Sequence, residues 1–287
     1  MSSINPNSSE RTGSIPLSIS EEVKLDFKLS LQAFRNNVKA FMGTELFAFL
    51  FFVVGMLISV LITLIYLKVK VEEIAEPLVI LMLLPGFLIS IWLFQAMLTC
   101  QYGLAFDIMS SGDMFAEFKG SFSYFKRFWW QYPLLSLIFT LSGFFTQFDL
   151  PIKFFITEVN VQIMLYTPLT YCLTVLFIEI FPSLTSSSNL KASFKENFLI
   201  LKQNPKRLLA TWGIFYIIFQ FIPSIVIFII SLLSNLLFEE LITIIIFITL
   251  IIVMLFWMFV IGYPVMTLIA TRIYNSTKES GNNKRME

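Results

Sequence analysis

The chain has 287 residues, of which 57% are hydrophobic and only 14% are charged. A soluble domain carries about a quarter charged residues, so this composition excludes an ordinary soluble protein and indicates that lipid surrounds much of the chain. The net charge of +1 points to no acidic partner, and the two cysteines, Cys100 and Cys172, are too few for a disulfide framework or a thiolate metal site.

Residues 1–17 are polar and lack the basic start and apolar core of a cleavable signal peptide, so we expect a disordered N-terminal tail. Several later apolar runs reach the roughly 20 residues that a helix needs to cross a hydrocarbon layer of about 30 Å. They predict an all-α transmembrane bundle with six spans: Leu46–Leu67, Leu78–Leu104, Pro133–Phe148, Val161–Pro182, Leu208–Asn235 and Leu241–Thr271. We expect one membrane domain, 18–274, followed by a polar C-terminal tail, 275–287.

The segments that flank these runs alternate between many and few lysine and arginine residues. All but three of the 20 basic residues lie on the side that carries both termini. The positive-inside rule makes that side the cytoplasm, so we expect a multi-pass protein of the cell membrane with both ends cytoplasmic. Trp129, Trp130, Tyr132 and Trp212, near the cytoplasmic starts of two spans, fit an interfacial aromatic belt.

Three cytoplasmic stretches resemble one another: DFKLSLQAFRNNVKAF, EFKGSFSYFKRFWWQY and SFKENFLILKQNPKRL. Each contains Phe-Lys, then a large apolar residue four and seven positions after the Phe, and a basic residue after eight. The matched residues are Phe27, Leu31, Phe34 and Arg35; Phe118, Phe122, Phe125 and Lys126; and Phe194, Phe198, Leu201 and Lys202. Spacings of three and four predict an amphipathic helix in each stretch.

Other features recur with these helices. Asn37 matches Asn204, and a serine-rich stretch that suits an N-cap precedes each copy. The serines are Ser18 and Ser20, with Glu21 after them; Ser110 and Ser111, with Asp113; and Ser186, Ser187 and Ser188. We predict three repeats, about 18–104, 105–182 and 183–274, each an amphipathic helix followed by a transmembrane hairpin in the same orientation. The alternative is chance recurrence in a chain with 33 phenylalanines.

This pattern of serine cap, Phe-Lys helix and hairpin resembles a broad group of bacterial and archaeal six-helix membrane proteins. The group includes the membrane domain attached to some glycerophosphodiester phosphodiesterases. The resemblance covers about Ser18 to Tyr274, and it implies a fold class and a membrane location. It carries over no catalytic residue, because the soluble phosphodiesterase domain with its metal ligands is missing from this sequence.

The sequence offers little catalytic chemistry. It contains no histidine, which excludes Ser-His and Cys-His catalysis and imidazole zinc sites, and it contains no phosphate-binding glycine motif. We therefore expect no enzyme, cofactor or metal site. Two carboxylates, Glu45 and Glu179, lie near the ends of spans; we interpret them as boundary residues that reach water or a basic neighbour, with a transported ion or substrate as the alternative.

Four prolines are candidate helix breaks: Pro85, Pro168, Pro223 and Pro264. Broken helices form the binding centres of many transporters, although prolines are also ordinary kinks in membrane helices. Gly55, Ser59 and Thr63 recur every fourth residue on the first span, and we expect them to let another helix of the same chain approach closely.

The basic side of the amphipathic helices provides candidate membrane-surface contacts, namely Lys28, Arg35, Lys39, Lys119, Lys126, Lys195 and Lys202. The apolar stripes either lie in the cytoplasmic leaflet or pack against the bundle. The expected partner is the lipid bilayer and its anionic headgroups, not nucleic acid; the sequence leaves a protein partner or an oligomer open. We predict a non-enzymatic protein that organises or senses the membrane, or docks a partner, with a transporter for a small or lipid-like molecule as the alternative.

Overall fold

The computed structural model describes residues 18–69, 76–111, 115–137, 171–223, 225–226, 229–230 and 240–286. These residues are helical with short breaks, and none of them forms a strand. Three of the helices are long and apolar enough to cross a membrane, Ile19–Ile65, Leu83–Ser110 and Ile248–Ser280, so a helical membrane protein is supported. Pro168, most of the third predicted span and the first ten residues of the fourth lie outside the described residues.

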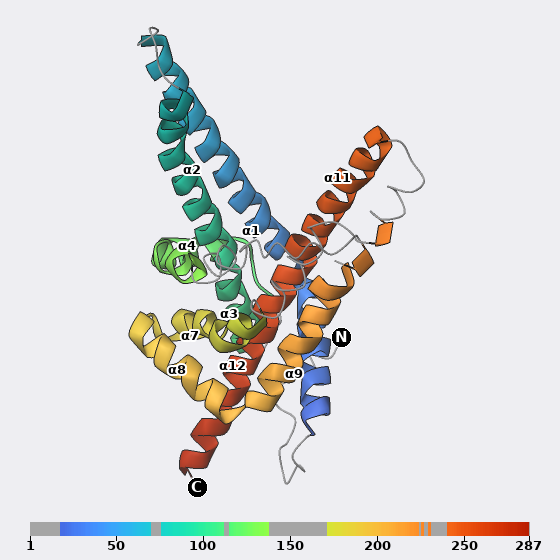
Figure 1. The fold of residues 1–287 in the computed structure, drawn as a ribbon. Helices are drawn as coiled ribbons and strands as arrows, with labels where there is room; N and C mark the ends of the chain where they lie inside the picture. Colours follow the sequence, from blue (N-terminus) through green and yellow to red (C-terminus); the bar gives the residue numbers. More distant parts are fainter. Residues whose placement is uncertain are drawn as a thin grey trace.

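The first hairpin consists of α1 (Ile19–Val69) and α2 (Glu76–Thr99), which run side by side in Figure 1. The expected cap is confirmed: the Ser18 N–H donates to the Glu21 carboxylate at 2.9 Å, and the Glu21 N–H donates to Ser18 Oγ at 3.4 Å. With 51 residues, α1 is about 75 Å long when measured along its axis, more than twice the hydrocarbon thickness. Two helices meet in it across a kink at Asn37, whose backbone is non-helical, so the first amphipathic stretch is the helix that precedes this kink.

Small residues bring α1 and α2 together, as expected. A Cβ on Gly55 would lie 2.3 Å from Ser90 Oγ, and one on Gly86 would lie 2.1 Å from Ser59 Oγ. The Ser59 hydroxyl also donates to the Leu83 carbonyl at 3.3 Å. The stripe of small residues thus serves packing within the chain.

The returning helix of this hairpin breaks at Cys100, and shorter helices follow. They are α3 (Gln101–Ser111), α4 (Lys119–Phe128), helical residues 131–137 and 171–177, α7 (Ile180–Ser187), α8 (Leu190–Gln203), α9 (Pro205–Tyr216), η1 (Ile217–Phe221), α11 (Glu240–Phe256), η2 (Trp257–Gly262) and α12 (Tyr263–Met286). Because α12 continues to Met286, most of the predicted C-terminal tail is helical.

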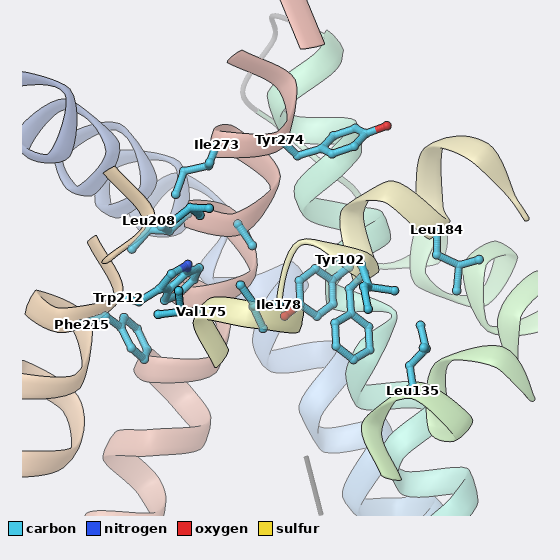
Figure 2. Packing of buried hydrophobic residues seen from close by; sticks show 14 of the residues in the cluster. Tyr102, Leu135, Val175, Ile178, Leu184, Leu208, Trp212, Phe215, Ile273 and Tyr274 are labelled. Carbon is cyan, nitrogen blue, oxygen red and sulfur yellow. The ribbon is translucent and has the colours of Figure 1, made fainter. Parts of the chain in front are cut away.

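The buried core lies at one end of the molecule, below the diverging hairpins of Figure 1. Its largest cluster joins α3, α7, α9 and α12 with helical residues 131–137 and 171–177; Figure 2 shows Tyr102, Leu184 and Trp212 within it. On α1, by contrast, large apolar side chains are exposed almost continuously from Leu46 to Ile65. Such a surface is expected where lipid covers a helix.

The serine caps of the second and third copies differ from expectation. Ser110 and Ser111 end α3, and the Ser110 hydroxyl donates to the Phe106 carbonyl within that helix. In the third copy, Asn189 is the N-cap of α8, and its side chain accepts from the Lys191 N–H at 3.0 Å. A serine hydroxyl bonds equally well to a carbonyl one turn back, so serine-rich sequence alone did not distinguish a helix end from a helix start.

The described prolines behave in two ways. Pro223 and Pro264 each follow a π-helical turn, η1 or η2, which contains the residue four positions earlier. A proline ring clashes with the carbonyl of that residue, and a π-turn relieves the clash. At Pro85, α2 continues without interruption, so the break expected there is not seen.

Candidate functional site

In all three copies, the apolar stripe of the amphipathic helix contains both packed and exposed positions. At the first and third stripe positions, Phe27, Phe34, Phe125, Phe194 and Leu201 pack against the main core cluster, and Phe118 packs against a smaller one. The middle position is exposed in each copy: Leu31 by 45%, Phe122 by 37% and Phe198 by 50%. Packing against the bundle therefore accounts for most of each stripe, but one large apolar residue per copy stays more than a third exposed, although Phe122 and Phe198 also contact neighbouring rings.

Each of these exposed residues stands between two exposed basic residues. Lys28 and Arg35 flank Leu31, Lys119 and Lys126 flank Phe122, and Lys195 and Lys202 flank Phe198. In every case the basic residues are three before and four after the apolar one, which places all three side chains on one helix face. Together with Lys39, these are the seven predicted surface residues; all are exposed, and none forms an ion pair with another described residue.

The α4 region adds aromatic side chains to this face. Phe115 and Trp129 lie seven residues before and after Phe122, and both are exposed, by 68% and 50%. Spacing of seven keeps Trp129, at the end of α4, on the same side as Phe122, whereas Phe115 precedes the helix. Trp129 and Trp130 therefore fit the predicted interfacial belt, but Tyr132 and Trp212 do not, because both are fully buried in the core.

The first and third stretches also bend at matching positions, and in the second a helix ends there. Asn37 has a non-helical backbone inside α1, and Asn204, its predicted counterpart, separates α8 from α9. In the second copy α4 ends at Phe128, which occupies the same position of the alignment. The Asn37 side chain fixes its bend by accepting a hydrogen bond from the Ala116 N–H at 2.8 Å.

A buried ion-pair network joins the first and third copies. Asp26, which is fully buried, accepts from Arg207 Nε at 2.8 Å, from Arg207 Nη2 at 2.6 Å and from Arg272 Nε at 3.0 Å. Arg207 also donates to Ser276 Oγ at 3.1 Å and lies 3.9 Å from Glu22. Burial lowers the pKa of Arg207, but the hydrogen bond and charge of Asp26 outweigh it, so the pKa lies above its ordinary value.

Glu179 corrects the sequence interpretation. It lies in the turn before α7, it is 1% exposed, and neither of its carboxylate oxygens has a hydrogen-bond partner among the described residues. Burial raises the pKa of this carboxyl well above its ordinary value, and the charge of Asp26 acts in the same direction, whereas the charge of Arg207 opposes both. Of the two surroundings expected for Glu179, water is wrong, because α7 and residues 171–177 fold into the core, whereas a basic neighbour, Arg207, does act on it. Glu45, by contrast, accepts a hydrogen bond from Gln101 Nε2 at 3.0 Å.

Six further side chains have a buried polar atom without a described partner. They are Ser30 Oγ, Gln101 Oε1, Tyr102 Oη, Gln131 Oε1, Thr211 Oγ1 and Trp212 Nε1. Most buried polar atoms in proteins are hydrogen-bonded, so seven such side chains, with Glu179, are unusual. Among the described residues no group of three or more His, Cys, Asp or Glu side chains could hold a metal ion.

Comparison of the chain with protein-family models, curated proteins and solved structures finds no match. The resemblance to six-helix membrane proteins therefore stays a prediction. The sequence pointed to the exposed basic residues but missed the buried network. Its only signal was the position of Arg207 and Arg272 at the ends of predicted spans, where hydropathy treats them as ordinary boundary charges; Asp26 lies within the first amphipathic stretch.

Proposed function

We propose that this protein is a non-enzymatic membrane organiser built from three helix–hairpin repeats, which contacts the cytoplasmic leaflet through its amphipathic helices. One observation carries the proposal: in all three copies an exposed apolar residue, Leu31, Phe122 or Phe198, stands between two exposed basic residues. An apolar side chain among lysines and arginines suits the boundary between acyl chains and anionic headgroups.

The repeat itself is part of the proposal. The bends at Asn37 and Asn204 support it, as does the alternation of packed and exposed stripe positions in all three copies. A third support is the matching burial of one residue in each copy. Fourteen residues after Phe27, Phe118 and Phe194, the side chains of Phe41, Tyr132 and Leu208 are fully buried. Chance recurrence of Phe-Lys helices would not produce matching burial at such a distance.

Spin labels at single cysteines test the membrane contact. Labels replace Leu31 and Phe198 in turn, in a Cys172→Ser background and in nanodiscs with anionic lipid. Matched controls carry the label five residues later, at Asn36 and Gln203, which are exposed but point roughly 140° away on the helix. The accessibility of each label is measured by paramagnetic enhancement of its spin relaxation. We expect oxygen, which concentrates in lipid, to enhance the relaxation of the labels at Leu31 and Phe198. A water-soluble nickel complex should enhance the relaxation of the control labels. Equal exposure of all four labels to the nickel complex would contradict leaflet contact and favour a docking surface for a protein.

A transporter is the second candidate, because all three returning helices are interrupted where their aromatic residues meet. The breaks are Cys100, the turn at Ile178 and Glu179, and η2. Just after them, Tyr102 stacks on Phe181 with ring centroids 4.8 Å apart and meets Tyr263 edge-on at 6.3 Å. Proteoliposomes test this candidate: a Pro264→Ala variant, which alters the proline after η2, should lose solute flux if this π-turn belongs to a pathway, and unchanged flux would count against it.

A further inference from the structure

One cation at the end of α4 is held in place by neutral groups. Arg127 Nη2 donates to Ser188 Oγ, in the turn between α7 and α8, and the guanidinium carbon lies 5.0 Å from the centroid of the Phe128 ring. Among the described residues, Arg127 forms no ion pair. Asp107, a carboxylate of the adjoining α3, instead accepts a 2.6 Å hydrogen bond from Tyr124, one turn before Arg127. The positive charge of Arg127 is therefore available for an anion.

Ser188 supplies a second donor in direct contact with the first. It is the C-cap of α7, and its hydroxyl oxygen accepts the hydrogen bond from Arg127. A serine hydroxyl has one hydrogen to donate, and within the described part of the chain no acceptor for it is found. The guanidinium of Arg127 has five N–H donors in a planar fork that matches the oxygens of a phosphate group. Two elements of the fold thus bring donors to one point at the surface.

Ring contacts between α4 and α1 place this point near the lipid boundary. The ring centroids of Phe47 and Phe122 lie 5.3 Å apart, and those of Phe51 and Phe125 lie 5.5 Å apart. Phe47 and Phe51 belong to the first turns of the apolar stretch of α1 that is exposed to lipid, and α4 lies beside the lower part of this hairpin in Figure 1. Arg127 follows Phe125 by two residues, and an arginine side chain is long enough to reach the headgroup layer from there.

Beyond Arg127 the exposed side chains become aromatic and then aliphatic. Trp130 and Leu134 follow it at spacings of three and four, and both are 44% exposed. The backbone remains helical through Trp129, and the Leu134 N–H donates to the Trp130 carbonyl at 3.3 Å, so the three side chains lie on one side of the chain. A cation, an interfacial aromatic residue and a leucine in successive turns follow the order of headgroup, boundary and acyl chain.

We infer that Arg127 and Ser188 bind the phosphate of one anionic phospholipid of the cytoplasmic leaflet, whose acyl chains lie along Trp130 and Leu134. Residues 119–137 contain three basic residues and no acidic residue, and this charge favours an anionic lipid over a zwitterionic one. The inference rests on the proposed membrane role and adds one specific lipid site to it. None of its residues carries a label in the spin-label experiment, so the site and the leaflet contact of the other copies can fail separately.

Native mass spectrometry of the purified full chain counts bound lipid directly. The chain in detergent micelles is titrated with phosphatidylglycerol or with phosphatidylcholine of the same acyl chains. We expect the first phosphatidylglycerol to bind about tenfold more tightly, because the ammonium of choline meets only cations at this site. Glycerol phosphate, which lacks acyl chains, should compete weakly. If it displaces the lipid at equal concentration, the site binds a soluble anion and the lipid assignment is overturned.

Two variants and a matched control complete the test. Arg127→Gln should weaken binding of the first phosphatidylglycerol about tenfold through the loss of a charge-assisted hydrogen bond. Ser188→Ala, which removes the neutral donor, should weaken it about threefold and keeps the site testable if Arg127→Gln does not fold. Lys206→Gln removes an exposed positive charge at the start of α9 and should retain the affinity. Equal affinity of the unmodified chain for the two lipids, or equal losses in Arg127→Gln and Lys206→Gln, would overturn the inference.

Discussion

The two halves of α1 show how differently one helix can be stabilised. Between Val23 and Thr44 the helix buries polar and small side chains such as Asp26 and Ala33 against other helices. From Leu46 to Ile65 it exposes leucine and isoleucine on most sides and packs mainly on α2 through glycine and serine. In lipid a leucine gains no hydrophobic free energy by being buried in protein, so close approach of the two backbones stabilises the hairpin. Specific side-chain packing and ion pairs stabilise the lower core.

The largest expected effect comes from the ion-pair network of the lower core. Asp26→Ala leaves two partly buried guanidinium groups without their fully buried carboxylate, and breaking a buried ion pair costs about 3–5 kcal/mol in the free energy of unfolding. Glu22→Ala, which removes a partly exposed carboxylate 3.9 Å from Arg207, should cost less than about 1 kcal/mol. Denaturant titration of both variants measures the difference, and similar losses would show that Asp26 does not hold the core together.

Matched leucines compare the core with the lipid-facing surface directly. Leu184 is fully buried in the main cluster, so Leu184→Ala should cost about 2–5 kcal/mol in unfolding free energy through the cavity that it leaves. Leu57 is 63% exposed on α1, and Leu57→Ala should change the same free energy by at most about 0.5 kcal/mol. Equal destabilisation by the two variants would mean that the exposed face of α1 packs against protein.

This contrast explains what hydropathy could and could not predict. The helical class, the cap at Ser18 and the close approach at Gly55 follow from run length and local spacing. The predicted spans wrongly included residues that lie in the lower core, such as Leu104 and Leu268. Hydropathy gives a leucine the same value in lipid and in a protein core, so it could not separate the two environments. The partners of Asp26 are 181 and 246 residues away in sequence, so no local pattern could place them beside it.

Two glycines test how tightly the lower helices approach one another. A Cβ on Gly103 would lie 2.2 Å from the ring of Tyr124, which donates a 2.6 Å hydrogen bond to Asp107. Gly103→Ala should therefore displace α4 from α3 and cost about 1–3 kcal/mol in unfolding free energy. At Gly213 the nearest atom is 3.7 Å away, so Gly213→Ala should be neutral or stabilise the helix by up to about 1 kcal/mol. Faster hydrogen exchange in α4 of the first variant alone would confirm the contact.

The smallest expected effect lies at the bend between the two halves of α1. Asn37→Ala removes the acceptor for the buried Ala116 N–H, which should cost about 1–2 kcal/mol in unfolding free energy. Alanine also has the higher helix propensity, so the upper and lower halves should straighten into one continuous helix and loosen the segment before α4. Asn36→Ala changes an exposed neighbour of the same type and should leave hydrogen exchange at 115–118 unchanged. If both variants exchange at the same rate there, the Asn37 side chain does not anchor that segment, and packing alone determines the bend.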